Sequence, residues 1–131
     1  MVILQTTLCL AAAAAVLNIW ISWRVGQLRR AAKVSVGDGG DERLTRRMRA
    51  HANFIENTPL VLILIGAIEL AGKGGSWLAV VGAGYMLARV CHVLGMDGGS
   101  MQWGRVVGTA VTMLAQLGLA AVAVMSALGR I

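Results

Sequence analysis

Long runs of apolar residues alternate with short polar segments along the chain. The first run, residues 2–23, and the last run, residues 106–128, contain no charged residue. Each is close to the length of about 20 residues that a helix needs to cross the hydrocarbon core of a bilayer. Both runs therefore predict membrane-spanning helices. The first run lacks the basic start of a signal peptide, so we expect it to remain as the first span.

Two shorter apolar runs lie between these and contain polar residues. The run over residues 58–72 reaches spanning length only if its helix begins near residue 44, in a basic segment. The run over residues 76–94 contains Arg89 and His92. Glycine-rich turns, GKGG and GMDGG, separate the later runs. The expected helices span residues 2–26, 44–72, 76–96 and 103–128, with a basic loop over residues 27–43.

The composition supports a membrane protein built from one domain. The 131 residues are 57% hydrophobic and only 14% charged, whereas soluble domains carry about 25% charged residues. A chain of this length is expected to form one domain. The sequence therefore predicts an all-α fold, in which residues 1–131 form an integral membrane bundle of four helices.

The net charge of +6 comes mainly from basic residues beside the apolar runs. That placement favours a role in membrane topology over nucleic-acid binding, and we expect no nucleic-acid partner. Most basic residues lie in or near the first loop, and Arg89 and Arg105 approach the same side. By the positive-inside rule, the first and third loops face the cytoplasm and both termini are non-cytoplasmic.

Cys9, Cys91 and Glu69 are interpreted as residues without chemical roles. Both cysteines lie in apolar runs, which favours small buried hydrophobic residues over a disulfide or a metal site. Glu69 falls near the far end of the second expected helix and is interpreted as interfacial. The two histidines are far apart and no pair of carboxylates accompanies them, so the sequence predicts no metal site.

The segment RRMRAHANFIENTPL places polar residues on one face of the second expected helix. At about 100° per residue, four of its side chains fall within an arc of about 80°, and a fifth extends this arc by about 20°. These five are Arg46, Arg49, Asn53, Glu56 and Asn57. Arg47 and His51 point elsewhere, and we interpret them as surface or packing residues.

Similar faces occur on the next two helices, at spacings of four, three and four residues. The third helix carries Tyr85, Arg89, His92 and Met96, and the fourth carries Arg105, Thr109, Thr112 and Gln116. Ionisable groups at membrane depth are costly and usually face a bundle interior or a cavity. Three such faces near one membrane surface predict a shared polar pocket, within a subunit or between subunits.

The residues of this pocket favour a small zwitterionic ligand with several carboxylates. Arginine binds carboxylates through paired hydrogen bonds. The candidate arginines are Arg46, Arg49, Arg89 and Arg105, with Arg24 as a further one. Glu56 is suited to accept from an ammonium group, and Asn53 is suited to an amide or a carbonyl.

Structural roles remain open for the same residues. Arginines near a membrane surface also anchor helices to lipid headgroups. Arg49 and Glu56 also suit an ion pair across the bundle, and Arg89 with His92 also suits packing. The threonines of the fourth helix and Gln116 also suit hydrogen bonds between helices.

Taken in order, these motifs resemble the MAPEG family, the membrane-associated proteins in eicosanoid and glutathione metabolism. RMRAHANFIENTPL is similar to the family's Arg-x-x-x-Asn-x-x-Glu pattern followed by proline. VSVGDGG, ARVCHVLG and RVVGT support the resemblance by their order, and the first and last are most similar to the bacterial branch. The resemblance covers nearly the whole chain.

The resemblance implies a homotrimer that binds glutathione between subunits near the cytoplasmic side. It implies that glutathione contacts Arg49, Asn53 and Glu56, with Arg89, His92 and Arg24 as further candidates beside Arg46. It also implies that Arg105 stabilises the glutathione thiolate, which is the nucleophilic form of the thiol. The implied activity is a glutathione transferase or peroxidase in a bacterial inner membrane, with glutathione as co-substrate. Its second substrate would be a lipophilic electrophile, either a hydrophobic small molecule or a lipid.

The chain also departs from the family. Several eukaryotic members have tyrosines where this sequence has Asn57, Met96 and Thr109. The departure leaves the second substrate open. Two other classes also remain open: a non-catalytic ligand-binding or partner protein of the same fold, and a small proton-coupled multidrug transporter that uses Glu56.

Overall fold

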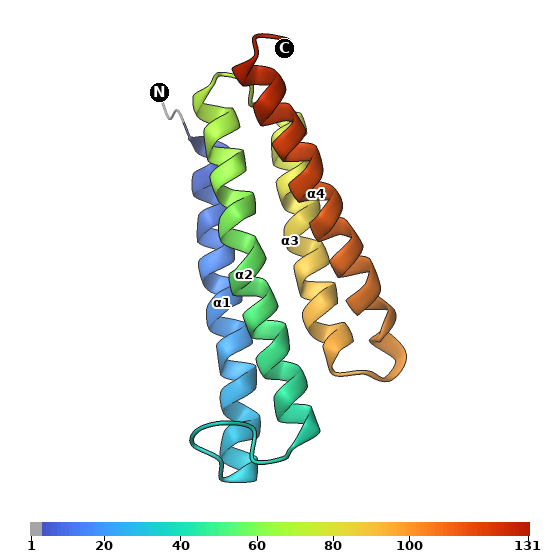
Figure 1. The fold of residues 1–131 in the computed structure, drawn as a ribbon. Helices are drawn as coiled ribbons and strands as arrows, with labels where there is room; N and C mark the ends of the chain where they lie inside the picture. Colours follow the sequence, from blue (N-terminus) through green and yellow to red (C-terminus); the bar gives the residue numbers. More distant parts are fainter. Residues whose placement is uncertain (1–3) are drawn as a thin grey trace.

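The computed structural model describes residues 4–131, which form helices without a strand (Figure 1). The four long helices are α1 (Gln5–Ala32), α2 (Glu42–Leu70), α3 (Ser76–Met96) and α4 (Trp103–Ala127), and a short 3-10 helix, η1 (Gly99–Met101), precedes α4. Each long helix is apolar enough and long enough to cross a membrane. The prediction of an all-α bundle with four spanning helices is confirmed.

The four helices form two hairpins that pack against each other. α1 pairs with α2, and α3 pairs with α4 (Figure 1). The α1–α2 loop and η1 lie at one end of the bundle, which we call the loop end, and both termini lie at the other end (Figure 1).

The first helix continues past residue 26, where its end was expected, and reaches Ala32. Arg29 and Arg30 lie in its last turn, where positive side chains interact favourably with the helix dipole. The helix ends at Lys33, whose φ of 56° is left-handed. The basic residues after the apolar run therefore extend the helix, and the loop is shorter than expected. The expected start at residue 2 lies outside the described residues.

The second helix begins at Glu42 because Asp41 caps it. The Asp41 carboxylate accepts hydrogen bonds from the backbone N–H groups of Arg43 and Leu44. Such a cap satisfies N–H groups that have no partner inside the helix. The Arg43 side chain beside it holds the pKa of the Asp41 carboxyl below its ordinary value.

The start of α1 is capped from another helix. Leu4, at the N-cap position, makes no side-chain hydrogen bond to the helix. Instead, the Glu69 carboxylate of α2 accepts from the backbone N–H groups of Thr6 and Thr7, both at 2.9 Å, and from the Thr7 hydroxyl at 2.7 Å. A carboxylate at this position is favoured by hydrogen bonding and by the helix dipole. Glu69 therefore ties α1 to α2, a more specific role than the interfacial one expected.

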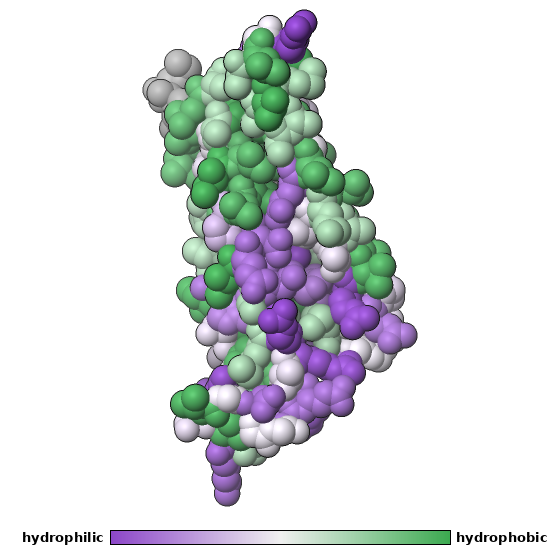
Figure 2. Space-filling model, in the orientation of Figure 1, coloured by the Kyte–Doolittle hydropathy of each residue, from purple (hydrophilic) through white to green (hydrophobic). Residues whose placement is uncertain are grey.

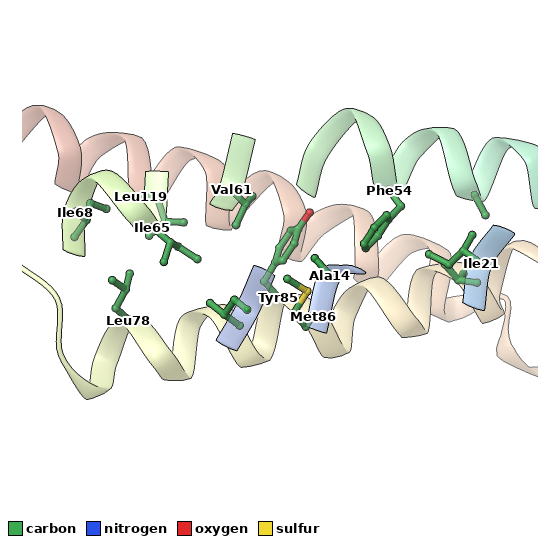
Figure 3. Packing of buried hydrophobic residues seen from close by; sticks show 13 residues of the cluster. Ala14, Ile21, Phe54, Val61, Ile65, Ile68, Leu78, Tyr85, Met86 and Leu119 are labelled. Atoms are coloured by element: carbon green, nitrogen blue, oxygen red, sulfur yellow. The ribbon is translucent and has the colours of Figure 1, made fainter. Parts of the chain in front are cut away.

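The apolar core extends along the middle of the bundle. Ile65, Ile68, Leu78 and Leu119 pack at the end near the termini, and Tyr85 lies further toward the loop end (Figure 3). Cys9 was expected to be buried, but it is exposed on the single chain. The expectation is wrong because α1 turns Leu10, and not its neighbour Cys9, toward the other helices.

Three glycines bring the backbones of α3 and α4 into contact. A Cβ atom would lie 2.2 Å from the Arg105 nitrogen if added at Gly95, 2.3 Å from the Cys91 carbonyl oxygen at Gly104, and 2.4 Å from His92 Cβ at Gly108. Small residues allow such close approach of membrane helices. The contact sets His92 of α3 close to the start of α4.

Candidate functional site

A cavity of about 480 Å³ lies between α2, α3 and α4, and we call it the interhelical pocket. It brings together four of the residues that the sequence proposed for ligand binding: Arg49, Asn53, His92 and Arg105. The rest of its lining is mostly apolar and consists of Met96, Val106, Thr109, Ala110 and Met113. The pocket therefore combines cationic and amide groups with a hydrophobic side.

A second cavity of about 570 Å³ adjoins the first at the loop end. The two share Met96, Arg105 and Val106. The second cavity adds Arg46, whose guanidinium also donates to Glu42 at 2.7 Å, together with Gln102. Arg105 therefore stands where the two cavities meet.

Arg49 and Arg105 are exposed on the single chain. Within residues 4–131, neither guanidinium forms an ion pair. The ion pair between Arg49 and Glu56, one of the alternatives from the sequence, is thus not formed within residues 4–131 of one chain. Both cations remain available to a negatively charged ligand.

Arg89 lies behind the wall of the interhelical pocket. Its side chain is 0% exposed, and it does not line the pocket. It donates to Asn53 Oδ1 at 2.5 Å, to Thr112 Oγ1 at 2.8 Å and to His92 Nδ1 at 3.3 Å. Arg89 therefore supports two pocket residues without lining the pocket itself.

Further hydrogen bonds between polar side chains continue away from the loop end. Asn57 Oδ1 accepts from Gln116 Nε2 at 2.8 Å, and the Thr58 and Tyr85 hydroxyls lie 3.0 Å apart. Figure 2 shows hydrophilic residues gathered over the loop half of this face, with a narrow strip reaching into the hydrophobic half. The hydrogen-bonding role left open for Thr112 and Gln116 is therefore the one that the structure shows.

Two proposed ligand residues lie outside both cavities. Glu56 is exposed on α2, and among the described residues it has no ion-pair partner. Arg24 pairs with Asp97 at the end of α3 and stacks over Trp20, with its guanidinium carbon 5.1 Å from the ring centroid. The structure thus assigns Arg24 a contact between helices.

Sequence reasoning missed the role of Asp97. Besides Arg24, it accepts from Arg47 Nε at 3.1 Å, so one carboxylate joins α1, α2 and α3. Its position in the GMDGG turn indicated only turn chemistry. Arg47 and His51 were interpreted as surface or packing residues, and His51 does pack against α1, with Nε2 2.8 Å from Asn18 Oδ1.

Comparison with known proteins agrees with this arrangement. The model of the MAPEG family matches residues 7–125, which include most of all four helices. The chain belongs to the MAPEG family. It is also similar to the inner membrane protein YecN of Escherichia coli strain K12 and of strain O6:H1 (CFT073), with 29% identity over 95 residues in each case. That length is 72% of this chain and 72% of each relative.

These findings confirm the resemblance drawn from the motifs. Four spanning helices and similarity to an inner membrane protein indicate that this MAPEG protein is a multi-pass protein of the inner membrane. Among residues 4–131, no group of three His, Cys, Asp or Glu side chains is placed to hold a metal ion. The polar groups that line the pocket of this MAPEG protein are guanidinium, amide, imidazole and hydroxyl groups beside an apolar surface.

Proposed function

We propose that this MAPEG protein is a membrane glutathione transferase or peroxidase that acts on lipophilic electrophiles. The observation that carries the proposal is the meeting of Arg49, Asn53, His92 and Arg105 in one pocket with an apolar side. Family membership supports glutathione as the ligand. The apolar side suits a second substrate that arrives from the bilayer.

The charges of the pocket match the chemistry that such a reaction needs. Arg49, with Arg46 in the adjoining cavity, offers guanidinium groups to the two carboxylates of glutathione. Arg105, between the cavities, is suited to stabilise the thiolate. A nearby cation lowers the pKa of a thiol, and the thiolate is the attacking species. The thiolate then forms a sulfur–carbon bond with the electrophile, which gives up its leaving group or takes up a proton.

Glu56 supports the further proposal of a homotrimer. A charged side chain that faces lipid within a spanning helix is costly. Glu56 is exposed on a spanning helix, so covering it by a neighbouring subunit removes much of this cost. In such an assembly, Glu56 would also reach the ammonium group of a glutathione bound between subunits.

The position of the pocket near the loop end also supports access of glutathione from the cytoplasm. Both cavities are nearer the loop end, which carries most of the basic residues. We infer from the positive-inside rule that this end faces the cytoplasm and that both termini lie on the opposite side.

A glutathione titration of the purified protein tests the proposal. Wild-type protein is expected to bind glutathione and to develop thiolate absorbance, and Arg49→Ala to bind more weakly. Arg105→Ala is expected to lose turnover of a generic hydrophobic electrophile more than it loses binding. Arg30→Ala, which removes an exposed arginine at the end of α1, serves as the control. Absence of glutathione binding by the wild type would refute the proposal.

Two other functions make different predictions. A non-catalytic protein of this fold would bind glutathione without forming thiolate or turning over an electrophile. A proton-coupled transporter is favoured only by the exposed position of Glu56 within a span. It would move protons into vesicles when substrate is added, and Glu56→Gln would abolish that flux.

A further inference from the structure

A buried arginine behind the interhelical pocket determines which polar atoms one wall of the pocket presents to a ligand. Asn53 and His92 line the pocket, and both are bound on their far side by the buried guanidinium of Arg89. Among residues 4–131, its third side-chain hydrogen bond goes to the Thr112 hydroxyl. Thr112 in turn donates to the Gly108 carbonyl oxygen at 2.8 Å, so its lone pairs face the arginine.

The chemistry of arginine decides how its two pocket partners are oriented. Arginine has N–H donors and no acceptor, so any atom that it hydrogen-bonds must be an acceptor. For Asn53 this atom is the amide oxygen. For His92 it is Nδ1, which must therefore carry no proton. The orientation of an amide and the tautomer of a histidine are usually inferred from such networks. Because Arg89 can only donate, it allows one amide orientation for Asn53 and one tautomer for His92.

The polar atoms that remain on these two side chains are both donors. They are the amide nitrogen of Asn53 and the protonated Nε2 of His92. Among residues 4–131, no side chain or carbonyl accepts from the Asn53 amide nitrogen. The polar residues of α2 and α3 that line the pocket therefore all present N–H donors to it. The Arg105 guanidinium adds further N–H donors from α4.

The position of Arg89 is poorly explained by stability alone. Its guanidinium is fully buried, has no carboxylate partner among the described residues, and its Nε makes no hydrogen bond there. A buried charge without a countercharge is costly, and an apolar residue of similar volume often stabilises a protein as well or better. A role in the pocket accounts for the charge.

We propose that Arg89 is a positioning residue that makes this wall donor-only, so that the wall selects an anionic acceptor group, a carboxylate or a thiolate. An ammonium or another donor placed against this wall is disfavoured, because neither Asn53 nor His92 offers it an acceptor. The inference rests on the proposed function for the identity of the ligand as glutathione. The donor-only polarity of the wall follows from the hydrogen bonds of Arg89 and is independent of the proposed function.

The histidine tautomer tests the inference without any ligand. The chain has two histidines, so a spectrum of protein labelled with ¹⁵N-histidine contains two imidazoles, and His51→Gln assigns them. At neutral pH, His92 is expected to be neutral, with the proton on Nε2. Arg89→Leu is expected to release this preference and give a mixture of tautomers. A wild-type His92 that carries a proton on Nδ1 would overturn the inference, whether or not glutathione binds.

The isosteric change Asn53→Asp tests the consequence for binding. It replaces the amide N–H donors with a carboxylate oxygen and gives Arg89 a countercharge. The melting temperature is expected to stay level or rise, whereas the affinity for glutathione is expected to fall roughly tenfold to hundredfold, as when a hydrogen bond to a charged group is lost. Asn57→Asp adds the same charge about one turn away, outside the pocket lining, and is the matched control.

The two experiments separate failure of the inference from failure of the proposed function. If wild-type protein binds no glutathione, the proposed function fails and the His92 tautomer alone decides the inference. If wild type binds glutathione and Asn53→Asp binds it equally well, the proposed function survives and the donor-only wall is refuted. If Asn57→Asp weakens binding as much as Asn53→Asp, added charge explains the loss and the inference also fails.

Discussion

Replacing Gly108 with alanine tests whether the close contact of α3 and α4 shapes the interhelical pocket. A Cβ atom at Gly108 would lie 2.4 Å from His92 Cβ and 2.7 Å from the Ala88 carbonyl oxygen. Carbon atoms in ordinary contact are at least about 3.5 Å apart, so the helices would have to separate by about 1 Å at this level. That movement would carry His92 away from α4, and therefore from Arg105.

The size of the effect can be bounded by a control on the same helix. Overpacking of a well-packed site costs about 1–3 kcal/mol, whereas alanine in place of glycine favours a helix by up to about 1 kcal/mol. A Cβ atom at Gly118 would meet nothing within 4 Å, so Gly118→Ala receives only the gain. Because the gain is common to both variants, their unfolding free energies should differ by about 1–3 kcal/mol.

Thermal unfolding in detergent, followed by tryptophan fluorescence, measures this difference. Gly108→Ala is expected to melt several degrees below Gly118→Ala. It is also expected to bind glutathione more weakly and turn over more slowly, because displacements of about 1 Å can cost about a hundredfold in rate. If the two variants melt together and bind glutathione equally, the glycine contact does not determine the geometry of the pocket.

Three further predictions concern the ends of the helices. Glu69→Gln is expected to lower stability by about 1 kcal/mol, since the start of α1 loses a charged cap; an unchanged melting temperature would contradict this. Asp97→Asn removes the carboxylate shared by two arginines, and hydrogen exchange in η1 is expected to increase; unchanged exchange would show that the ion pairs do not hold η1. Hydrogen bonds from the Gly40 N–H and the Thr45 hydroxyl lower the pKa of Asp38, so the amide shift of Gly40 should titrate with a midpoint below 3.8. Since the folded-state pKa is lowered, the stability that Asp38 contributes is present at neutral pH and is lost as the pH falls through that midpoint; a midpoint at or above the ordinary value would rule this out.

The helical periodicity of the sequence was enough to find the pocket residues of α2. Arg49 and Asn53 fall near the middle of the predicted polar face, and both line the pocket. Glu56 falls at the edge of that face and lies outside the pocket. An angle around one helix axis gives the direction of a side chain, but the positions of the neighbouring helices decide what covers it.

Other features depend on contacts that no local pattern encodes. Arg24 and Asp97 are 73 positions apart in the chain. In the sequence, Arg24 is explained as a membrane anchor and Asp97 as a turn residue, so neither indicates the other as a partner. Arg89 and His92 share one face of α3, yet Arg89 lies behind His92. α3 is the most buried of the four helices, so residues on several of its sides are enclosed. A pattern that divides a helix into one polar and one apolar face does not predict this.

The buried guanidinium of Arg89 also bears on how the chain is inserted into the membrane. An arginine near the middle of a segment raises its apparent insertion free energy by about 2.5–3.5 kcal/mol. α3 leaves the ribosome after α2, which supplies Asn53, and before α4, which supplies Thr112. The third segment thus reaches the translocon with one polar partner already made and the other still to be synthesised. We therefore expect stable integration of α3 to follow the synthesis of α4, with the two helices entering the bilayer as a hairpin.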